Sequence, residues 1–382
     1  MTDTIVIIGT GLAGYTLARE IRKRDGEVPL CLITQDDGAS YSKPMISNAL
    51  GKQKTPDKLV MASVDKMRVD LNAEILAHKS VTAIDQVRRS IELDDGSTVD
   101  YARLVLAVGS QVVRPPLQGD GLDHVYSINS LEDYRGFRRR IEGCHSVAII
   151  GPGLIGCEFA NDLISAGYEV HVIGPDAWPL SRLLPAQAGA AVREALEKIG
   201  VHWYLHRIAQ AVQLADGKVN VVMDNERQLQ VDVVLSAIGL HANTTLANAA
   251  GLHINRGIVV DRKLCSSDPH IYALGDCAEV EGMVLPFVMP LMQQTRALAA
   301  TLTGTPTDVS YPAMPVLVKT TSYPVIVSPP PYEAQGAWEE EILDGGVKAL
   351  FKSGQHVLGF ALTGAATSER QALMKLLPKV MP

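Results

Sequence analysis

The sequence predicts an α/β fold, because a short apolar run, a glycine-rich turn and a helical pattern follow one another twice along the chain. The first copy has an apolar run at residues 4–8 and the turn Gly9-Thr10-Gly11-Leu12-Ala13-Gly14. The second has an apolar run at residues 147–150 and the turn Gly151-Pro152-Gly153-Leu154-Ile155-Gly156. At 382 residues, the chain is long enough for two or three domains with sizeable cores.

Strand, G-x-G-x-x-G turn and helix together form a dinucleotide-binding fingerprint. The first glycine makes a tight turn, the second lets the backbone approach a pyrophosphate, and the third lets helix and strand pack closely. Either turn alone could lack a nucleotide, but two copies in matching contexts favour two bound dinucleotides. The prediction is therefore two Rossmann-like dinucleotide-binding domains and a small α+β C-terminal domain.

Composition excludes several classes of protein. The chain is 47% apolar and 20% charged, its mean hydropathy is +0.10, and its net charge is −7. No apolar run is long enough to span a bilayer, and the first is too short for a signal peptide. The acidic balance offers no electrostatic footprint for nucleic acid. We therefore expect a cytoplasmic protein that binds neither membrane nor nucleic acid.

Cysteine and histidine usage narrows the chemistry further. The five cysteines are Cys31, Cys144, Cys157, Cys265 and Cys277. They form no C-x-x-C pair, so a disulfide framework is not expected, and Cys31 and Cys157 are expected in the core. The ten histidines show no metal-ligand spacing, and no metal is predicted.

The first domain continues into a second buried strand at residues 30–34, which ends at Gln35-Asp36-Asp37-Gly38. Asp36 lies 36 − 14 = 22 positions after Gly14, where an acid is expected to hold a ribose hydroxyl, with Asp37 as second candidate. Both could instead be turn residues. Alternating segments at 74–83 and 87–93 predict a β-excursion, residues 101–109 a buried strand, and residues 111–116 a linker.

The rest of the chain completes the predicted domains. A strand at residues 169–173, a helix at 186–199 and strands at 219–223 and 231–235 complete the second domain, and residues 236–239 lead back to the first. Strands within 316–327 and 348–360, with a stiff turn at 328–331, form the last domain. The predicted limits are 1–109 with 237–314, then 110–236, then 315–382.

Together, these features resemble the two-dinucleotide flavoprotein reductases over the whole chain. The resemblance rests on the two fingerprints, Leu106-Ala107-Val108-Gly109, and Ile271-Tyr272-Ala273-Leu274-Gly275-Asp276. It implies noncovalent FAD at the first fingerprint, NADH at the second, and contact between Asp276 and the ribityl chain of FAD. Tyr41-Ser42-Lys43-Pro44, residues 154–163 and Val318-Lys319-Thr320 look most like bacterial rubredoxin reductases. That likeness implies electron transfer to rubredoxin, a small acidic iron protein, as in the chain that feeds an alkane hydroxylase.

The same resemblance places cofactor contacts along both fingerprints and at isolated positions elsewhere. The implied contacts are Gly9, Gly11, Leu12, Ala13, Gly14, Thr34, Asp36, Lys43, Pro44, Val81, Ala107, Gly109, Gly151, Gly153, Leu154, Ile155, Gly156, Glu158, Gly239, Gly275, Asp276, Val288 and Lys319. Val288 and Met289 are expected just before a helix that begins at Pro290. The positive end of that helix would stabilise negative charge on the reduced flavin.

Glu158, Lys43 and Lys319 are the catalytic candidates. In relatives, a glutamate at the position of Glu158 pairs with a lysine near the flavin, but the usual lysine position holds Asn48 here. Glu158 is therefore expected to pair with Lys43 or Lys319. The alternatives are that Glu158 is an exposed residue of the first helical turn and that Lys319 only protects an edge strand.

Two features bear on the electron donor and on partners. Relatives that prefer NADH usually carry an acid where Gly174 stands, and Asp176 lies two positions later. No arginine cluster immediately follows this strand, so NADH is favoured over NADPH. Arg138-Arg139-Arg140 is expected to be a solvated helix end, or else to help dock an acidic partner.

The missing cysteine pair separates this chain from reductases that pass electrons through thiols, so electrons are expected to leave the flavin directly. Two alternatives stay open at this point. One is a ferredoxin reductase of an oxygenase system, and the other is a non-enzymatic flavoprotein that acts as a binding or signalling module.

Overall fold

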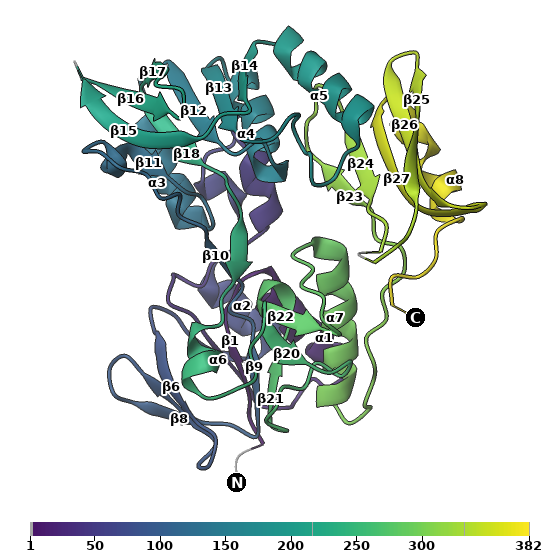
Figure 1. The fold of residues 1–382 in the computed structure, drawn as a ribbon. Helices are drawn as coiled ribbons and strands as arrows, with labels where there is room; N and C mark the ends of the chain where they lie inside the picture. Colours follow the sequence, from purple (N-terminus) through teal and green to yellow (C-terminus); the bar gives the residue numbers. More distant parts are fainter. Residues whose placement is uncertain (1–2, 216, 332, 382) are drawn as a thin grey trace.

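The computed structural model describes residues 3–215, 217–331 and 333–381, and Figure 1 shows them arranged in three units. The first unit is built on a parallel sheet in the order β21-β9-β1-β2-β5. Its strands are β1 (Ile5–Ile8), β2 (Leu30–Ile33), β5 (Glu74–Leu76), β9 (Arg103–Leu106) and β21 (Ile271–Ala273). One hydrophobic core joins this sheet to helices α1 (Leu12–Arg22) and α7 (Val288–Leu302). Strands buried in this way are apolar throughout, which is why the sequence shows runs rather than alternation.

The second unit repeats this plan with a parallel sheet in the order β11-β18-β12-β13-β14. Its strands are β11 (Val125–Tyr126), β12 (Ser146–Ile150), β13 (Glu169–Gly174), β14 (Val201–Leu205) and β18 (Val233–Ser236). Helices α3 (Leu131–Ile141), α4 (Leu154–Ser165) and α5 (Ala186–Lys198) belong to it, as does an antiparallel sheet of β15 (Ala209–Ala215), β16 (Lys218–Met223) and β17 (Gln228–Val231). Strand β12 lies between β18 and β13, as β1 lies between β9 and β2.

The third unit is an antiparallel sheet in the order β23-β24-β27-β26-β25, with the short helix α8 (Arg370–Met374). Its strands are β23 (Val316–Val318), β24 (Val325–Ser328), β25 (Ala337–Leu343), β26 (Gly346–Ser353) and β27 (His356–Gly364). The predicted α/β fold class is confirmed. Glu340 of β25 accepts a hydrogen bond from the backbone N–H of Ala188 at 2.9 Å, so a carboxylate of this sheet caps the N-terminus of α5.

Several predicted strands have other partners or bounds than expected. Residues 74–83 are not one excursion: β5 joins the parallel sheet, and only β6 (Val81–Asp85), β7 (Ser90–Leu93) and β8 (Thr98–Asp100) form the antiparallel excursion. The run 231–235 divides into the end of β17 and β18, in different sheets. The segments 316–327 and 348–360 each contain two antiparallel strands, and β25 was missed because its outer positions are charged.

The stretch expected as a linker is part of a paired ribbon between the first two units. β10 (Ser110–Val112) pairs antiparallel with β19 (Leu240–Ala242), so the outgoing and returning chains cross side by side. The label β10 lies between the two units in Figure 1. The remaining short elements are β3 (Ser40–Tyr41), β4 (Val60–Ala62), α2 (Val64–Leu71), α6 (Thr245–Ala249), β20 (Ile258–Val260), β22 (Ala278–Val280) and the 3₁₀ turns η1 (Lys43–Asn48), η2 (Asp57–Leu59), η3 (Leu122–His124), η4 (Gly275–Cys277) and η5 (Ala365–Glu369).

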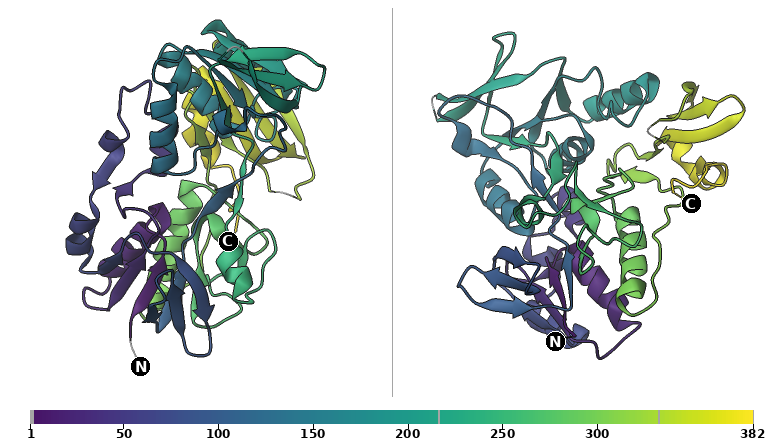
Figure 2. Two further views of the ribbon diagram at one scale, coloured as in Figure 1. Left: turned by 90° about the vertical axis from the view of Figure 1, so that its left-hand side faces the viewer. Right: turned by 60° about the horizontal axis from the view of Figure 1, so that its bottom comes forward.

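The three units meet around α4. A second hydrophobic core contains residues of η1, of α3 and α4, and of strands β23 and β24. Figure 2 shows the chain after β3 leaving the first unit and running along the second unit. The C-terminal sheet also lies beside the second unit. The domain limits given above stay a prediction, because a segment of the first predicted domain contributes to this shared core.

Candidate functional site

The two fingerprints have the same geometry. A Cβ on Gly9 would lie 2.3 Å from the carbonyl oxygen of Ala107, and one on Gly151 would lie 2.6 Å from that of Ala237. Both glycines have positive φ, +111° and +113°. In each copy the last glycine packs on the first: a Cβ on Gly14 or Gly156 would lie 1.9 Å from the oxygen of Gly9 or Gly151. Neither position can carry a side chain, so the sequence motif is a packing requirement.

The middle glycines differ, because open space lies beside them. A Cβ on Gly11 or Gly153 would meet nothing within 4 Å. Each is the N-cap of its helix, makes no side-chain capping bond, and is followed by a first turn without acids. Free backbone N–H groups at a helix N-terminus bind phosphate. Both sites therefore fit the pyrophosphate of a dinucleotide such as FAD or NADH, and the adjoining Leu12, Ala13, Leu154 and Ile155 begin these helices.

The loop after β2 brings Asp36 to the first fingerprint. Asp36 Oδ1 accepts hydrogen bonds from Thr34 Oγ1 at 2.7 Å, from the backbone N–H of Gly38 at 3.0 Å and from Thr10 Oγ1 at 3.5 Å. All of these bonds use one carboxylate oxygen, Oδ1. Lys79 N–H donates to the carbonyl of Thr34, so the chain leading to Val81 runs beside this loop.

Asp276 follows strand β21, at the edge of the parallel sheet, and Lys43 begins the segment η1. Asp276 accepts a hydrogen bond from Ser110 Oγ at 3.0 Å, and the preceding Gly275 has φ +78°. Burial lowers the pKa of the Lys43 ammonium, while the charges of Asp276 and Asp133 work in the opposite direction. The Lys43 ammonium therefore feels the negative charges of both Asp276 and Asp133. Pro44, which follows it, starts the 3₁₀ turn η1 with it.

One expectation about this region is wrong in detail. Helix α7 begins at Val288 rather than at Pro290, so Val288 and Met289 form its first turn instead of preceding it. Proline is tolerated at the third position because first-turn N–H groups have no partner within the helix. Both apolar side chains remain about 40% exposed, at 41% and 40%.

Glu158 is fully buried in the second turn of α4, so the alternative of an exposed first-turn residue is wrong. Its Oε2 accepts hydrogen bonds from Lys319 Nζ at 2.5 Å and from Ser47 Oγ at 2.5 Å. Its Oε1 accepts the backbone N–H of Lys319 at 2.9 Å. Ser47 Oγ also accepts from Lys319 Nζ at 3.1 Å, which closes a ring of acid, hydroxyl and ammonium.

Of the two lysines expected to pair with Glu158, Lys319 does so, and within the described residues no ion pair joins Glu158 to Lys43. Lys319 follows the edge strand β23 but turns inward, with 20% of its side chain exposed, so it does more than protect an edge. Asn48, at the position where the resemblance led us to expect a lysine, is buried, and its Oδ1 has no hydrogen-bond partner in the part of the chain that the structure describes.

Ser47, Asn161 and Asp162 were missed by sequence reasoning. Asp162 accepts the backbone N–H groups of Leu50 and Gly51 at 3.0 and 2.9 Å. Asn161 bonds to Thr321 Oγ1 at 3.0 Å and accepts the Ser322 N–H at 3.1 Å. The spacing 158, 161, 162 places all three polar side chains on one face of α4, which was the available signal. This face ties the second unit to both others.

The surroundings of Gly174, at the end of β13, explain why this position does not carry the acid that was expected for an NADH-binding strand. A Cβ on Gly174 would lie 2.1 Å from Cδ of Pro152 in the second fingerprint, so no side chain fits there. Asp176 is half-buried, and its Oδ1 accepts a hydrogen bond from the hydroxyl of Ser181. Gly239, on the returning chain, has φ +127° and open space beside it.

The arginine run at the end of α3 is not simply a solvated helix end. Arg138 donates to the carbonyl of Lys54 at 3.0 Å, and Arg140 to that of Asp232 at 3.1 Å. Both are half-buried and join separate segments; Arg139 alone of the three is largely exposed.

The cysteines are free thiols. Burial raises the pKa of Cys31 and of Cys277 to about 12, and it raises that of Cys157 as well. Protonated, inaccessible thiols are poor nucleophiles. Cys144 and Cys265 are only half-buried. Among the described residues, no group of three or more His, Cys, Asp and Glu is arranged to hold a metal ion.

Comparison with known proteins shows the family. Residues 3–300 match the model of the pyridine nucleotide-disulphide oxidoreductases. The chain belongs to this family. Residues 308–377 match the rubredoxin binding C-terminal domain, and this segment contains the antiparallel sheet β23 to β27.

Full-length relatives of this oxidoreductase carry related names. The chain is 48% identical to a rubredoxin-NAD(+) reductase of Alcanivorax borkumensis, over 99% of both chains. It is 45% identical to one of Acinetobacter baylyi, over 99% of this chain and 98% of the other. A nitric oxide reductase FlRd-NAD(+) reductase of Vibrio vulnificus is 36% identical over 98% of both. Among solved structures, the ferredoxin reductase for the CYP199A2 system of Rhodopseudomonas palustris matches with a TM-score of 0.88 and 25% identity, covering 100% of this chain and 96% of that one.

The cofactors of this oxidoreductase are FAD and NADH, which agrees with the two open pyrophosphate cradles. In the part of the chain that the structure describes, no helix has the length and apolar character needed to cross a membrane.

Proposed function

We propose that this chain is an FAD-dependent reductase that carries electrons from NADH to rubredoxin. The observation that carries the proposal is the combination, in one chain, of a two-dinucleotide reductase at 3–300 with a rubredoxin-binding segment at 308–377. The full-length relatives named as rubredoxin-NAD(+) reductases support it. FAD, when bound, accepts a hydride from NADH and can release electrons singly, as a one-iron acceptor requires.

The residues of the chain are proposed to divide this work. Gly11 and the N-terminus of α1 would hold the FAD pyrophosphate, Asp36 its ribose, and Asp276 its ribityl chain. Gly153 and α4 would hold NADH. The Lys319 ammonium, held by Glu158 and Ser47, would be the charged group beside the reacting rings, which is consistent with its burial and its position between units.

Rubredoxin is favoured over ferredoxin as acceptor. The likeness to the ferredoxin reductase structure extends over the fold, but the buried Asn48 replaces the lysine expected in such enzymes. A binding or signalling module would not need a buried acid–ammonium ring at the junction of the units. Supply of an alkane hydroxylase, and a cytoplasmic location, stay predictions from the sequence.

An acceptor panel tests the proposal. The holoprotein is reduced anaerobically with NADH and mixed with rubredoxin, a plant-type ferredoxin, a small disulfide or oxygen. We expect the highest kcat/KM with rubredoxin. A faster reaction with ferredoxin or with the disulfide would refute the acceptor assignment, and slow reduction by NADH itself would favour the signalling alternative.

A further inference from the structure

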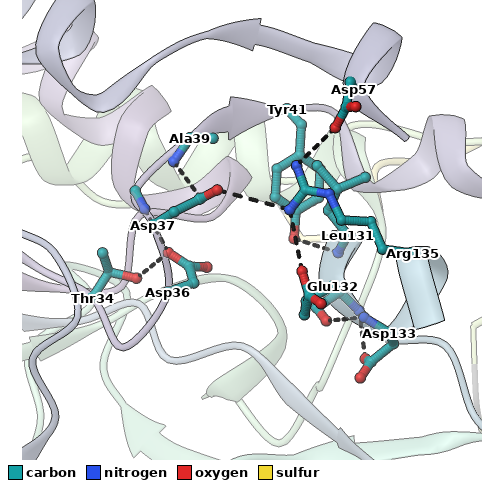
Figure 3. A network of polar contacts seen from close by, with 12 residues as sticks. Thr34, Asp36, Asp37, Ala39, Tyr41, Asp57, Leu131, Glu132, Asp133 and Arg135 are labelled. Atoms are coloured by element: carbon teal, nitrogen blue, oxygen red, sulfur yellow. Dashed lines mark hydrogen bonds and ion pairs between the residues drawn. The ribbon is translucent and has the colours of Figure 1, made fainter. Parts of the chain in front are cut away.

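Arg135, on the helix α3 of the second unit, lies against the nucleotide-binding loop of the first unit. Figure 3 shows its guanidinium between three carboxylates from different segments. Nη1 lies 3.2 Å from Glu132 Oε2 and 3.8 Å from Asp37 Oδ2, and Nη2 lies 3.4 Å from Asp57 Oδ1. Only 24% of the Arg135 side chain is exposed. The guanidinium is therefore largely covered, and it links the two units through carboxylates that are themselves exposed.

The loop that Arg135 contacts is built from two consecutive Asx turns. Asp36 Oδ1 accepts the N–H of Gly38 at 3.0 Å, and Asp37 Oδ1 accepts the N–H of Ala39 at 2.9 Å. The Asp37 carboxylate thus stabilises the part of the turn that directly follows Asp36. Arg135 contacts the other oxygen of Asp37 and holds the turn from outside (Figure 3).

The N-terminus of α3 is docked on the same segment. Tyr41, two residues beyond this turn, accepts the backbone N–H of Leu131 with its hydroxyl at 3.2 Å. The Ser130–Asp133 capping box fixes the rotation of the helix. The placement of Arg135 is therefore set by the fold, and its positive charge faces adjacent carboxylates that would otherwise repel one another and an anionic dinucleotide.

We propose that Arg135 is a positioning residue for FAD: the nicotinamide-binding unit holds the ribose-binding turn of the FAD site through the Arg135–Asp37 ion pair. FAD affinity then depends on a residue outside the unit that contains the fingerprint. The inference concerns the first nucleotide site alone and does not depend on the identity of the electron acceptor.

The test is a titration of the apoprotein with FAD, in which the change in flavin fluorescence measures binding. Arg135→Ala is expected to raise the Kd for FAD about three- to tenfold, since networked ion pairs exceed the small effect of isolated surface pairs. Arg135→Lys should restore part of the affinity. Arg139→Ala is the matched control: it lies one turn further along α3 and is 71% exposed, with Glu132 as its ion-pair partner. It should bind FAD as the wild type does.

A double-mutant cycle with Asp37→Asn shows whether the effect passes through Asp37. We expect Arg135→Ala to cost less affinity in the Asp37→Asn background than in the wild type. The proposal is overturned if Arg135→Ala binds FAD with wild-type affinity, if Arg139→Ala weakens FAD equally, or if the two changes are additive. If Arg135→Ala does not fold, Arg135→Lys and Asp37→Asn decide, and wild-type affinity in both would equally overturn it.

Discussion

Removal of the Lys319 side chain should destabilise this protein far more than removal of a similar lysine at the surface. Glu158 has no exposed area, and Lys319 supplies both a charge and a hydrogen bond to its Oε2. In a Lys319→Met variant the carboxylate keeps Ser47 and one backbone N–H but loses its counter-ion. Breaking a buried ion pair in this way typically costs about 3–5 kcal/mol.

Lys352→Met is the matched control. Lys352 pairs with Glu339 at 2.6 Å, but the two side chains are 32% and 65% exposed, so this loss should cost about 1 kcal/mol or less. Denaturant unfolding of the holoproteins, with the midpoint and slope of each transition, compares the two variants. A third variant that replaces both Glu158 and Lys319 by Met should regain most of the stability, because no unpaired charge remains buried. Equal losses in Lys319→Met and Lys352→Met would refute the account of a buried pair.

Three further predictions follow from the sites. Gly11→Val should fold but lose FAD, because a side chain there meets no protein atom and instead occupies the space through which the pyrophosphate approaches. Gly153→Val should keep FAD and lose NADH binding. A folded Gly11→Val protein with full flavin content would contradict this prediction. The kcat/KM for NADH should exceed that for NADPH by about tenfold or more, because Asp176 repels a 2′-phosphate. Asp176→Ala should reduce this ratio of efficiencies. Equal efficiencies in the wild type would show that Asp176 does not face the ribose. Although burial opposes ionisation, Lys218 and two backbone N–H groups hold the pKa of Asp232 well below its usual range. The ionised Asp232 therefore stabilises the fold above a pH of about 4, and this contribution is lost as the pH falls through the lowered pKa. Asp232→Asn should lower the thermal midpoint at pH 7 and weaken its dependence on acid, and an unchanged acid slope would argue against this role.

The sequence predicted those parts of the site that depend on short-range patterns. Gly14 and Gly156 are required by contacts with Gly9 and Gly151 inside their own strand–turn–helix units, so spacing alone located both fingerprints. The pairing of Glu158 stayed open between two lysines because Lys319 lies 161 positions away. Ser47 was not found at all, since a serine on a 3₁₀ turn carries no pattern that points to a helix 111 positions later.

The predicted limits of helices and strands were wrong where the neighbouring residues fit more than one structure. Helix α7 starts before Pro290 because a first-turn residue needs no N–H, so proline marked the turn but not its first position. Strand β25 contains three consecutive glutamates, Glu339, Glu340 and Glu341, which interrupt the apolar alternation of a strand, and its pairing with β26 was visible only in the fold. The stretch expected as a linker likewise begins as a strand, because β10 pairs with β19, more than a hundred positions later.

The central claim is that electrons pass from the flavin to rubredoxin without a thiol relay. The direct test is an anaerobic stopped-flow experiment in which NADH-reduced holoprotein is mixed with rubredoxin, before and after alkylation of the accessible thiols Cys144 and Cys265. The account predicts the same rate of rubredoxin reduction in both samples, because the three other thiols are buried and protonated. Loss of rubredoxin reduction on alkylation, with flavin reduction by NADH unchanged, would contradict it.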